Sequence, residues 1–171
     1  MPSQPPRVPP NFLPARDVHH AKLLKHAPPF IRQPKKRGRK WAGIKYERAA
    51  HEYFCELLAP YYTPGPWISF VDGPSGEHRF CQPDGLIIQP ERGRVTIVEF
   101  KYTHTELAYW QLFHLYLPVV QALFPPNLWK YAGVEICARY DCAIVCPEQP
   151  RLRKNVFDAF PTAFNVHIWR P

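Results

Sequence analysis

The chain has 171 residues, of which 46% are hydrophobic and 15% aromatic, and it carries a formal net charge of +8. This length and apolar content fit one folded domain with a tail. No apolar run reaches the roughly 18 residues that a membrane helix needs, and the N-terminus lacks the apolar run of a secretory signal, so we expect an intracellular protein with no membrane partner.

The positive charge is concentrated in the first 40 residues, which hold ten Lys or Arg and a single acid, whereas residues 41–171 hold twelve basic and thirteen acidic residues. Nine prolines and the repelling charges predict a largely extended basic arm over residues 1–40, with a short helix around residues 17–25. Residues 41–171 are expected to form the domain. The arm should contact nucleic-acid phosphates, with a solvated tail or a localisation signal as alternatives. The residues assigned to this contact are Lys35, Lys36, Arg37, Arg39 and Lys40.

A helical pattern opens the domain. Over residues 41–58 apolar side chains recur at three- and four-residue steps, and Pro60 ends the segment. Glu47 lies on or beside the inward face of this helix. A carboxylate there is costly unless it meets a cation or a metal ion.

Three β-like runs follow at residues 67–71, 79–89 and 94–102. Turn residues at 72–76 and 89–93 predict hairpin loops between them. The third run is rich in β-branched residues and is expected to be a central strand.

The rest of the chain predicts a second helix and a further strand. Residues 103–106 have the spacing of a capping box, which would open a helix over residues 107–124 with a kink at Pro118. A strand at 140–146, a short helix at 152–160 and a closing strand at 165–169 would follow. The order of helix, three strands, helix and strand predicts an α/β fold whose mixed central sheet is flanked by helices.

Three polar residues stand where core strands should be apolar. Asp84 follows Pro83 and interrupts its strand, whereas Glu99 and Lys101 lie two residues apart on the next strand and so leave the same face. If these strands pair around the 89–93 turn, two carboxylates and one ammonium group converge. The alternative is an ordinary Glu–Lys pair on an exposed strand, with Asp84 as a turn residue.

Such a cluster suits metal-assisted chemistry. Asp84 and Glu99, with the backbone carbonyl of Phe100 and waters, would form an all-oxygen site for Mg²⁺, which neutralises phosphate charge and lowers the pKa of a bound water. Lys101 could orient that water and stabilise the charge that builds on phosphorus. Glu47 could add a third acidic ligand or hold the ligand water.

The ordered pattern Pro83-Asp84, a gap, and Glu99-Phe100-Lys101 resembles the signature of the PD-(D/E)xK nuclease superfamily, over about residues 41–146. The resemblance implies a restriction-endonuclease-like core of order α-β-β-β-α-β. It also implies that Asp84 and Glu99 bind the metal and that Lys101 is the catalytic lysine.

Two further residues take roles from this resemblance. Glu47 matches a glutamate that the family often carries on its first helix. In the branch of bacterial recombination and phage exonucleases, a Gln precedes a Tyr by four residues on the next helix, and Gln111 matches that Gln. Tyr116 follows after five residues instead of four, so only Gln111 is carried over as a catalytic residue.

The resemblance implies a Mg²⁺-dependent deoxyribonuclease, with Mn²⁺ as a substitute, that hydrolyses DNA through a metal-activated water. DNA would be its partner, together with other proteins of a phage or recombination assembly. Its place would be the cytoplasm of a bacterial or phage-infected cell, with virion association as an alternative. The competing hypothesis is a non-catalytic DNA-binding or assembly protein that keeps the nuclease fold and acts through the basic arm.

Other signals are weaker. The five cysteines are an odd number and lack a Cys-x-x-Cys pair, so we expect buried free thiols and no iron–sulfur cluster. His104 and His114 flank the proposed site and are expected to be packed or solvent-facing rather than ligands. The aromatic residues between 109 and 116 are expected to form the inner face of the second helix, with base stacking as the alternative.

Overall fold

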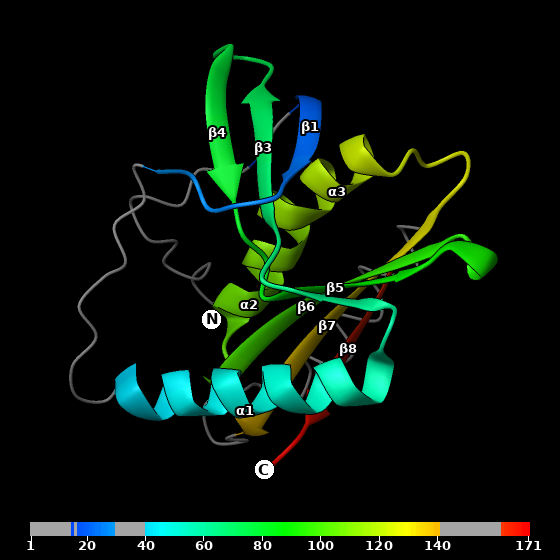
Figure 1. The fold of residues 1–171 in the computed structure, drawn as a ribbon. Helices are drawn as coiled ribbons and strands as arrows, with labels where there is room; N and C mark the ends of the chain where they lie inside the picture. The colour runs from blue at the N-terminus through cyan, green and yellow to red at the C-terminus, as the bar shows by residue number, and fades with distance from the viewer. Residues whose placement is uncertain (1–14, 16, 30–39, 141–161) are drawn as a thin grey trace, which may run out of the picture.

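The computed structural model describes residue 15 and residues 17–29, 40–140 and 162–171, which form a mixed α/β fold with two sheets (Figure 1). The elements in chain order are β1 (Val18–Leu24), α1 (Lys40–Leu58), β2 (Tyr62–Pro64), β3 (Trp67–Asp72), β4 (Glu77–Cys81), β5 (Gly85–Gln89), the 3₁₀ turn η1 (Pro90–Arg92), β6 (Arg94–Thr103), α2 (Glu106–Trp110), the π-helix η2 (Gln111–Tyr116), α3 (Leu117–Leu123), β7 (Lys130–Arg139) and β8 (Thr162–Ile168). None of the described helices is long and apolar enough to cross a bilayer.

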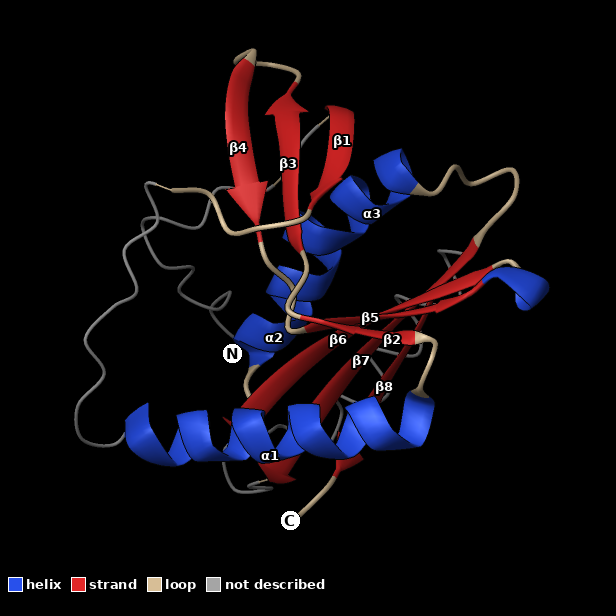
Figure 2. Cartoon of the chain, viewed as in Figure 1, coloured by secondary structure: helices blue, strands red, loops and turns tan. Residues whose placement is uncertain are grey.

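The larger sheet has five strands in the order β2-β5-β6-β7-β8. The pairs β2–β5 and β5–β6 are antiparallel, whereas β6–β7 and β7–β8 are parallel, so the sheet is mixed as expected. Helix α1 crosses one face of this sheet, and α2 with α3 lies on the other side (Figure 2).

Side-chain alternation along β6 divides the core between these two faces. Val98 and Phe100 pack with Tyr46 and Ala50 of α1. Ile97 packs on the opposite face, against the second helical segment, which consists of α2, η2 and α3. Because successive side chains of a strand point to opposite faces, Glu99 and Lys101 lie on the face away from α1.

The smaller sheet has three antiparallel strands in the order β1-β3-β4. Its inward residues Ile68 and Phe70 belong to the same core cluster as Leu112, Val119 and Val120 of the second helical segment. In Figure 1 this sheet stands beside α3, on the far side of the larger sheet from α1.

Strand β1 lies within the segment that was assigned to the basic arm. The prediction of a short helix around residues 17–25 is wrong, because this segment pairs in antiparallel register with β3, from Val18 opposite Asp72 to Leu24 opposite Trp67. Long-range ladder hydrogen bonds therefore override the weak local preference for a helix. Part of the first 40 residues belongs to the folded domain.

The run at residues 79–89 is two strands rather than one. Gln82, Pro83 and Asp84 separate β4 from β5, and the two strands belong to different sheets. Pro83 has no N–H to donate to a ladder, which favours a break at this point. The expected hairpins are confirmed, since β3 pairs with β4 and β5 pairs with β6 around their loops.

The second helix lies where it was predicted, but it differs from the prediction at its N-terminus and in its helix type. It begins at Glu106 with Thr105 as N-cap, and Thr105 makes no side-chain capping hydrogen bond. Thr103, expected to cap the helix, ends β6 instead, so the capping-box prediction is wrong. The middle of the segment is the π-helix η2, and Pro118 falls in the first turn of α3.

The sequence did not predict β7, which is the buried neighbour of β6. Tyr140, expected to start a strand, lies beyond the end of β7, and the rest of the strand expected at 140–146 lies outside the described residues. The helix expected at 152–160 also lies outside them. The closing strand is confirmed as β8, which pairs with β7.

A backbone hydrogen bond joins the N-terminal segment to the second helix. Pro118 cannot donate to His114, four residues earlier, and the His114 carbonyl accepts from the Ala15 N–H at 2.7 Å. Ala15 itself is buried in the core.

We therefore expect deletion of residues 1–29 to destabilise the domain, since it removes Ala15 and β1 and uncovers β3. The melting temperature should fall by at least about 5 °C, because 1 kcal/mol corresponds to roughly 2–4 °C in a chain of this size. Deletion of residues 1–14 alone, which keeps Ala15 and β1, is the control in the same thermal melt. Equal melting temperatures for the two deletions would refute a structural role for this segment.

Candidate active site

Asp84 lies where the β5–β6 ladder stops. The last paired residues are Gly85 and Val98, and the next N–H on β6 that faces β5, that of Phe100, donates to Asp84 Oδ2 at 2.6 Å. The carboxylate thus takes the place of a backbone acceptor that the diverging main chain no longer supplies. This bond fixes Asp84 beside β6.

Glu99 and Lys101 project from β6 at this same point. The Glu99 carboxylate is 2% exposed, the Lys101 side chain is 23% exposed, and Lys101 Nζ donates to Glu99 Oε1. The structure therefore brings Asp84, Glu99 and Lys101 together, and Lys101 is more accessible than Glu99.

The electrostatics of the cluster favour an added positive charge. Burial, assisted by the nearby Asp84 charge, raises the pKa of Glu99 to about 8, although Lys101 opposes this shift. Burial lowers the pKa of Lys101, but Glu99 and Asp84 outweigh it, so the pKa of Lys101 is raised and the ammonium form is retained. Two carboxylates thus share one cation, and a proton or a further cation is needed to balance them.

The free oxygens of the cluster fit a hard metal ion. Glu99 Oε2 and Gln111 Oε1 are buried and have no hydrogen-bond partner among the described residues. Buried polar atoms without partners are costly and are usually explained by an unseen water or ion. Oxygen donors are also the ligands that Mg²⁺ prefers. However, no three His, Cys, Asp or Glu side chains of the described part of the chain converge on one metal position, so further ligands would have to be carbonyls or waters.

Gln111 and Tyr116 reach the cluster from the π-helix. They are the first and last residues of η2, and in a π-helix hydrogen bonds join residues five apart, so both side chains fall on one face despite their spacing. Burial raises the pKa of Tyr116 well above its usual value, and the charges of Glu99 and Asp84 add to this, whereas a side-chain hydrogen bond from Gln111 opposes it. Tyr116, which α-helical spacing had set aside, therefore belongs to the cluster.

Tyr116 also holds the segment that carries Asp84. Its hydroxyl donates to the carbonyl of Gln82 at 3.2 Å, two residues before Asp84. The π-helix is thus tied directly to the turn between the two sheets.

A third acid, which the sequence did not single out, lies next to Glu99 on β7. Glu135 is opposite Glu99 in the parallel register and is fully buried. Both of its oxygens have partners, since Oε2 lies 2.8 Å from His104 Nδ1 and Oε1 accepts from the Thr105 N–H at 3.2 Å. Glu135 and His104 therefore hold the junction between β6 and α2. A glutamate inside an otherwise apolar run was the signal that could have revealed it.

Glu47 approaches the cluster only indirectly. It projects from α1, on the other face of the sheet, its side chain is 43% exposed, and its Oε1 lies 4.0 Å from His51 Nε2. Burial lowers the pKa of His51, which favours the neutral ring. His51 Nδ1 is 2.8 Å from the Tyr62 hydroxyl, which in turn donates to the Asp84 carbonyl at 3.5 Å. In this arrangement Glu47 does not reach Asp84 and Glu99 as a third metal ligand.

The remaining sequence predictions have mixed outcomes. The basic run lies outside the described residues except for the backbone of Lys40, which starts α1. Cys81 and Cys137 are buried and form no disulfide, as expected, but Cys55 is exposed, against expectation. His114 stacks on Trp110 with ring centroids 3.9 Å apart. His104 is buried, as expected, and it contacts the Glu135 carboxylate.

Three comparisons with known proteins give no match: no protein-family model, no curated protein and no solved structure matches this chain.

The raised pKa of Glu99 makes the metal-free protein sensitive to alkaline pH. Folding favours the protonated form of Glu99, so between the ordinary pKa of 4.5 and about 8 the folded state holds a proton that the unfolded state has lost. This contribution to stability is complete below pH 4.5 and is lost as the pH rises through 8.

In EDTA, we expect Glu99→Gln to melt at a higher temperature than the wild type at pH 9, with a smaller difference at pH 5. The exposed exchange Glu56→Gln should show no such pH-dependent gain. Mg²⁺ should raise the melting temperature of the wild type but not of Glu99→Gln. A pH-independent difference would mean that Glu99 does not carry this titration.

The hydrogen bond of Tyr116 predicts a positioning role for its hydroxyl. Tyr116→Phe should keep the fold but loosen the segment that carries Asp84, so that metal affinity falls about tenfold, the lower end of the range for outer-shell partners. The readout is the Mg²⁺ concentration that gives half-maximal thermal stabilisation. Tyr131→Phe is a matched control, because its hydroxyl likewise donates to a carbonyl, that of Phe124, away from the cluster. Equal metal responses of the two variants would contradict the assignment.

Proposed function

We propose that this protein is a Mg²⁺-dependent nuclease that hydrolyses phosphodiester bonds of DNA, on a restriction-endonuclease-like core. The observation that carries the proposal is the buried Glu99 carboxylate, which lies beside Asp84 and Lys101 and keeps one oxygen without a partner among the described residues. The mixed sheet between α1 and the second helical segment is compatible with such a core.

The metal would be held by Asp84, Glu99 and the backbone carbonyl of Phe100. When bound, it would neutralise phosphate charge and lower the pKa of a water ligand, which supplies the nucleophile. The Lys101 side chain is 23% exposed and retains its ammonium form, so it can donate to the phosphate oxygen or to the attacking water.

Other residues orient this cluster. Gln111 has a buried carbonyl oxygen free to accept from a water or from the substrate, and its amide group donates to Tyr116. Glu47 would act indirectly, through His51 and through Tyr62, whose hydroxyl contacts the Asp84 carbonyl.

A purely structural Glu–Lys pair explains the cluster less well. Such pairs are common at exposed positions, where they contribute little to stability. Glu99 is buried next to another acid, and this arrangement costs stability that an apolar residue would not cost. Active sites are the places where proteins retain such costs.

The proposal also includes a binding partner and a cellular location. The basic residues between 35 and 40 would add sequence-independent affinity for DNA through counterion release. The protein would act in the cytoplasm of a bacterial or phage-infected cell, alone or within a recombination or phage assembly.

Metal-dependent cleavage is the direct test. Linear, nicked, branched and single-stranded DNA should be cut with Mg²⁺ or Mn²⁺ and not in EDTA. Asp84→Asn keeps an oxygen that can accept from Phe100, so it should fold, yet it should lower the cleavage rate by about 10²–10³-fold, and Lys101→Ala should do the same.

Glu77→Gln, an exposed exchange in the β3–β4 hairpin, is the matched control and should cut at the wild-type rate. Cleavage that persists in Asp84→Asn and Lys101→Ala would exclude this site. DNA binding without any cleavage would favour the non-catalytic hypothesis.

A further inference from the structure

A second concave site lies on the α1 face of the larger sheet, opposite the face that carries Glu99. It is a pocket of about 710 Å³ between α1, the ends of β6 and β7, and the C-terminal residues. Three cations from separate segments line it, namely Lys45, Arg139 and Arg170, together with the rings of Tyr46 and Tyr102. The described residues that line the pocket include no acid.

The three cations are exposed, and each has one contact that limits the orientation of its side chain. The Arg139 guanidinium lies 5.1 Å from the Tyr102 ring centre, and Arg170 Nε donates to the Ala138 carbonyl at 3.1 Å. Lys45 Nζ lies 5.6 Å from the Trp41 ring centre. Among the described residues, no carboxylate pairs with any of the three, so their like charges favour an added anion.

The lining favours a nucleotide of a nucleic-acid strand over a small inorganic anion. The volume is in the range of organic ligand pockets, larger than one phosphate requires. Arginine and lysine recognise phosphate, and tyrosine and arginine planes stack on bases or sugars, which is the combination used by proteins that bind single strands.

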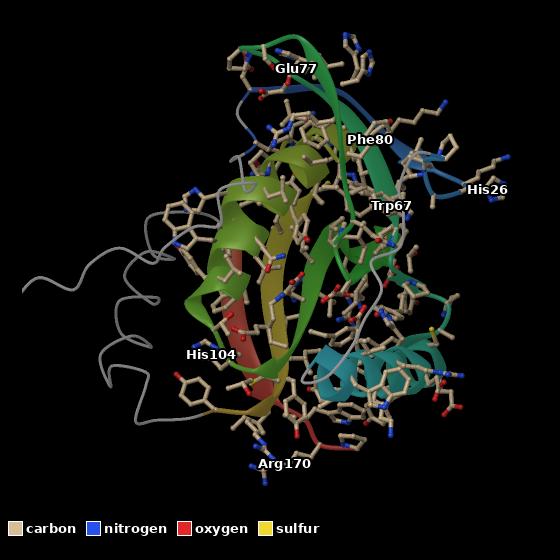
Figure 3. The ribbon with its side chains drawn as sticks, turned by 90° about the vertical axis from the view of Figure 1, so that its left-hand side faces the viewer. His26, Trp67, Glu77, Phe80, His104 and Arg170 are labelled. Carbon is tan, nitrogen blue, oxygen red and sulfur yellow. The ribbon has the colours of Figure 1, made fainter. Side chains whose placement is uncertain are left out.

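The pocket and the Asp84–Glu99–Lys101 cluster lie at the same end of the sheet. Tyr102 follows Lys101 directly in β6, and their side chains point to opposite faces. In Figure 3, His104, which follows β6, and Arg170 of the C-terminal segment both lie at the lower end of the sheet. A strand that crosses this end can contact both faces.

We propose that the pocket binds a nucleotide of the substrate strand, a few nucleotides from the bond that is cut, with its phosphate held by Lys45, Arg139 and Arg170. This inference rests on the proposed nuclease function for its substrate. The binding itself can be measured without any cleavage.

The experiment measures the affinity of the full-length protein for a labelled single-stranded DNA oligonucleotide and for a duplex, in EDTA, between 50 and 200 mM salt. Lys45→Ala, Arg139→Ala and Arg170→Ala should each weaken binding of the single strand about three- to tenfold. Each should also lower the slope of log affinity against log salt by about 0.7, the value for one single-strand phosphate contact. Arg139→Lys should retain most of the slope.

Arg48→Ala is the matched control. It removes one positive charge from the same helix, but Arg48 is 81% exposed, pairs with Glu52 and does not line the pocket. If the pocket variants change affinity and slope no more than Arg48→Ala does, while their melting temperatures match the wild type, the pocket is not a strand-binding site.

Cleavage with Mg²⁺ separates the two proposals. Pocket variants should require more DNA for half-maximal cleavage. Normal cleavage with unchanged binding would remove the pocket proposal and keep the nuclease. Pocket-dependent binding without cleavage by the wild type would keep the pocket and remove the nuclease.

Discussion

The hydrogen bond from the Phe100 N–H to Asp84 is the interaction on which the rest of the site depends. The chain before Gly85 is no longer paired with β6, and the Asp84 side-chain oxygen continues the ladder where the backbone does not. The bond holds Asp84 against β6 at the level of Glu99, so two carboxylates are forced together. The Tyr62 ring packs over the neighbouring Gly85 so closely that a Cβ there would lie 2.4 Å from it, which leaves the turn little freedom to move.

The consequence is a row of three acids: Asp84 just before β5, Glu99 in β6 and Glu135 in β7. Glu135 has hydrogen-bond partners for both oxygens, so its burial is satisfied and structural. Glu99 has Lys101 on one oxygen and no described partner on the other. The same sheet therefore contains one buried glutamate whose two oxygens both have partners and one that keeps an oxygen without a described partner, which is the difference expected between a structural carboxylate and a ligand-binding one.

The site was largely predictable because its geometry is local. The two-residue period of a strand places Glu99 and Lys101 on one face, and a short hairpin brings Asp84 back to them. Strand β1 was not predictable in this way, since its register depends on β3, about fifty residues later. Strand β7 was missed because Gly133 and Glu135 interrupt its apolar pattern, and these are residues whose roles appear only when the neighbouring elements are in place.

The π-helix shows how a helix can bring two side chains five residues apart to the same face. With 3.6 residues per turn, an α-helix would turn Tyr116 well away from the face of Gln111. The wider turn of η2, seen in the bond from the Leu117 N–H to the Leu112 carbonyl, returns Tyr116 to that face. Pro118 follows and cannot donate to His114, whose carbonyl accepts from Ala15 instead. The helical segment that directs Tyr116 at the acids therefore also accepts a hydrogen bond from the N-terminal segment. This bond links the site to β1, the strand at the edge of the smaller sheet.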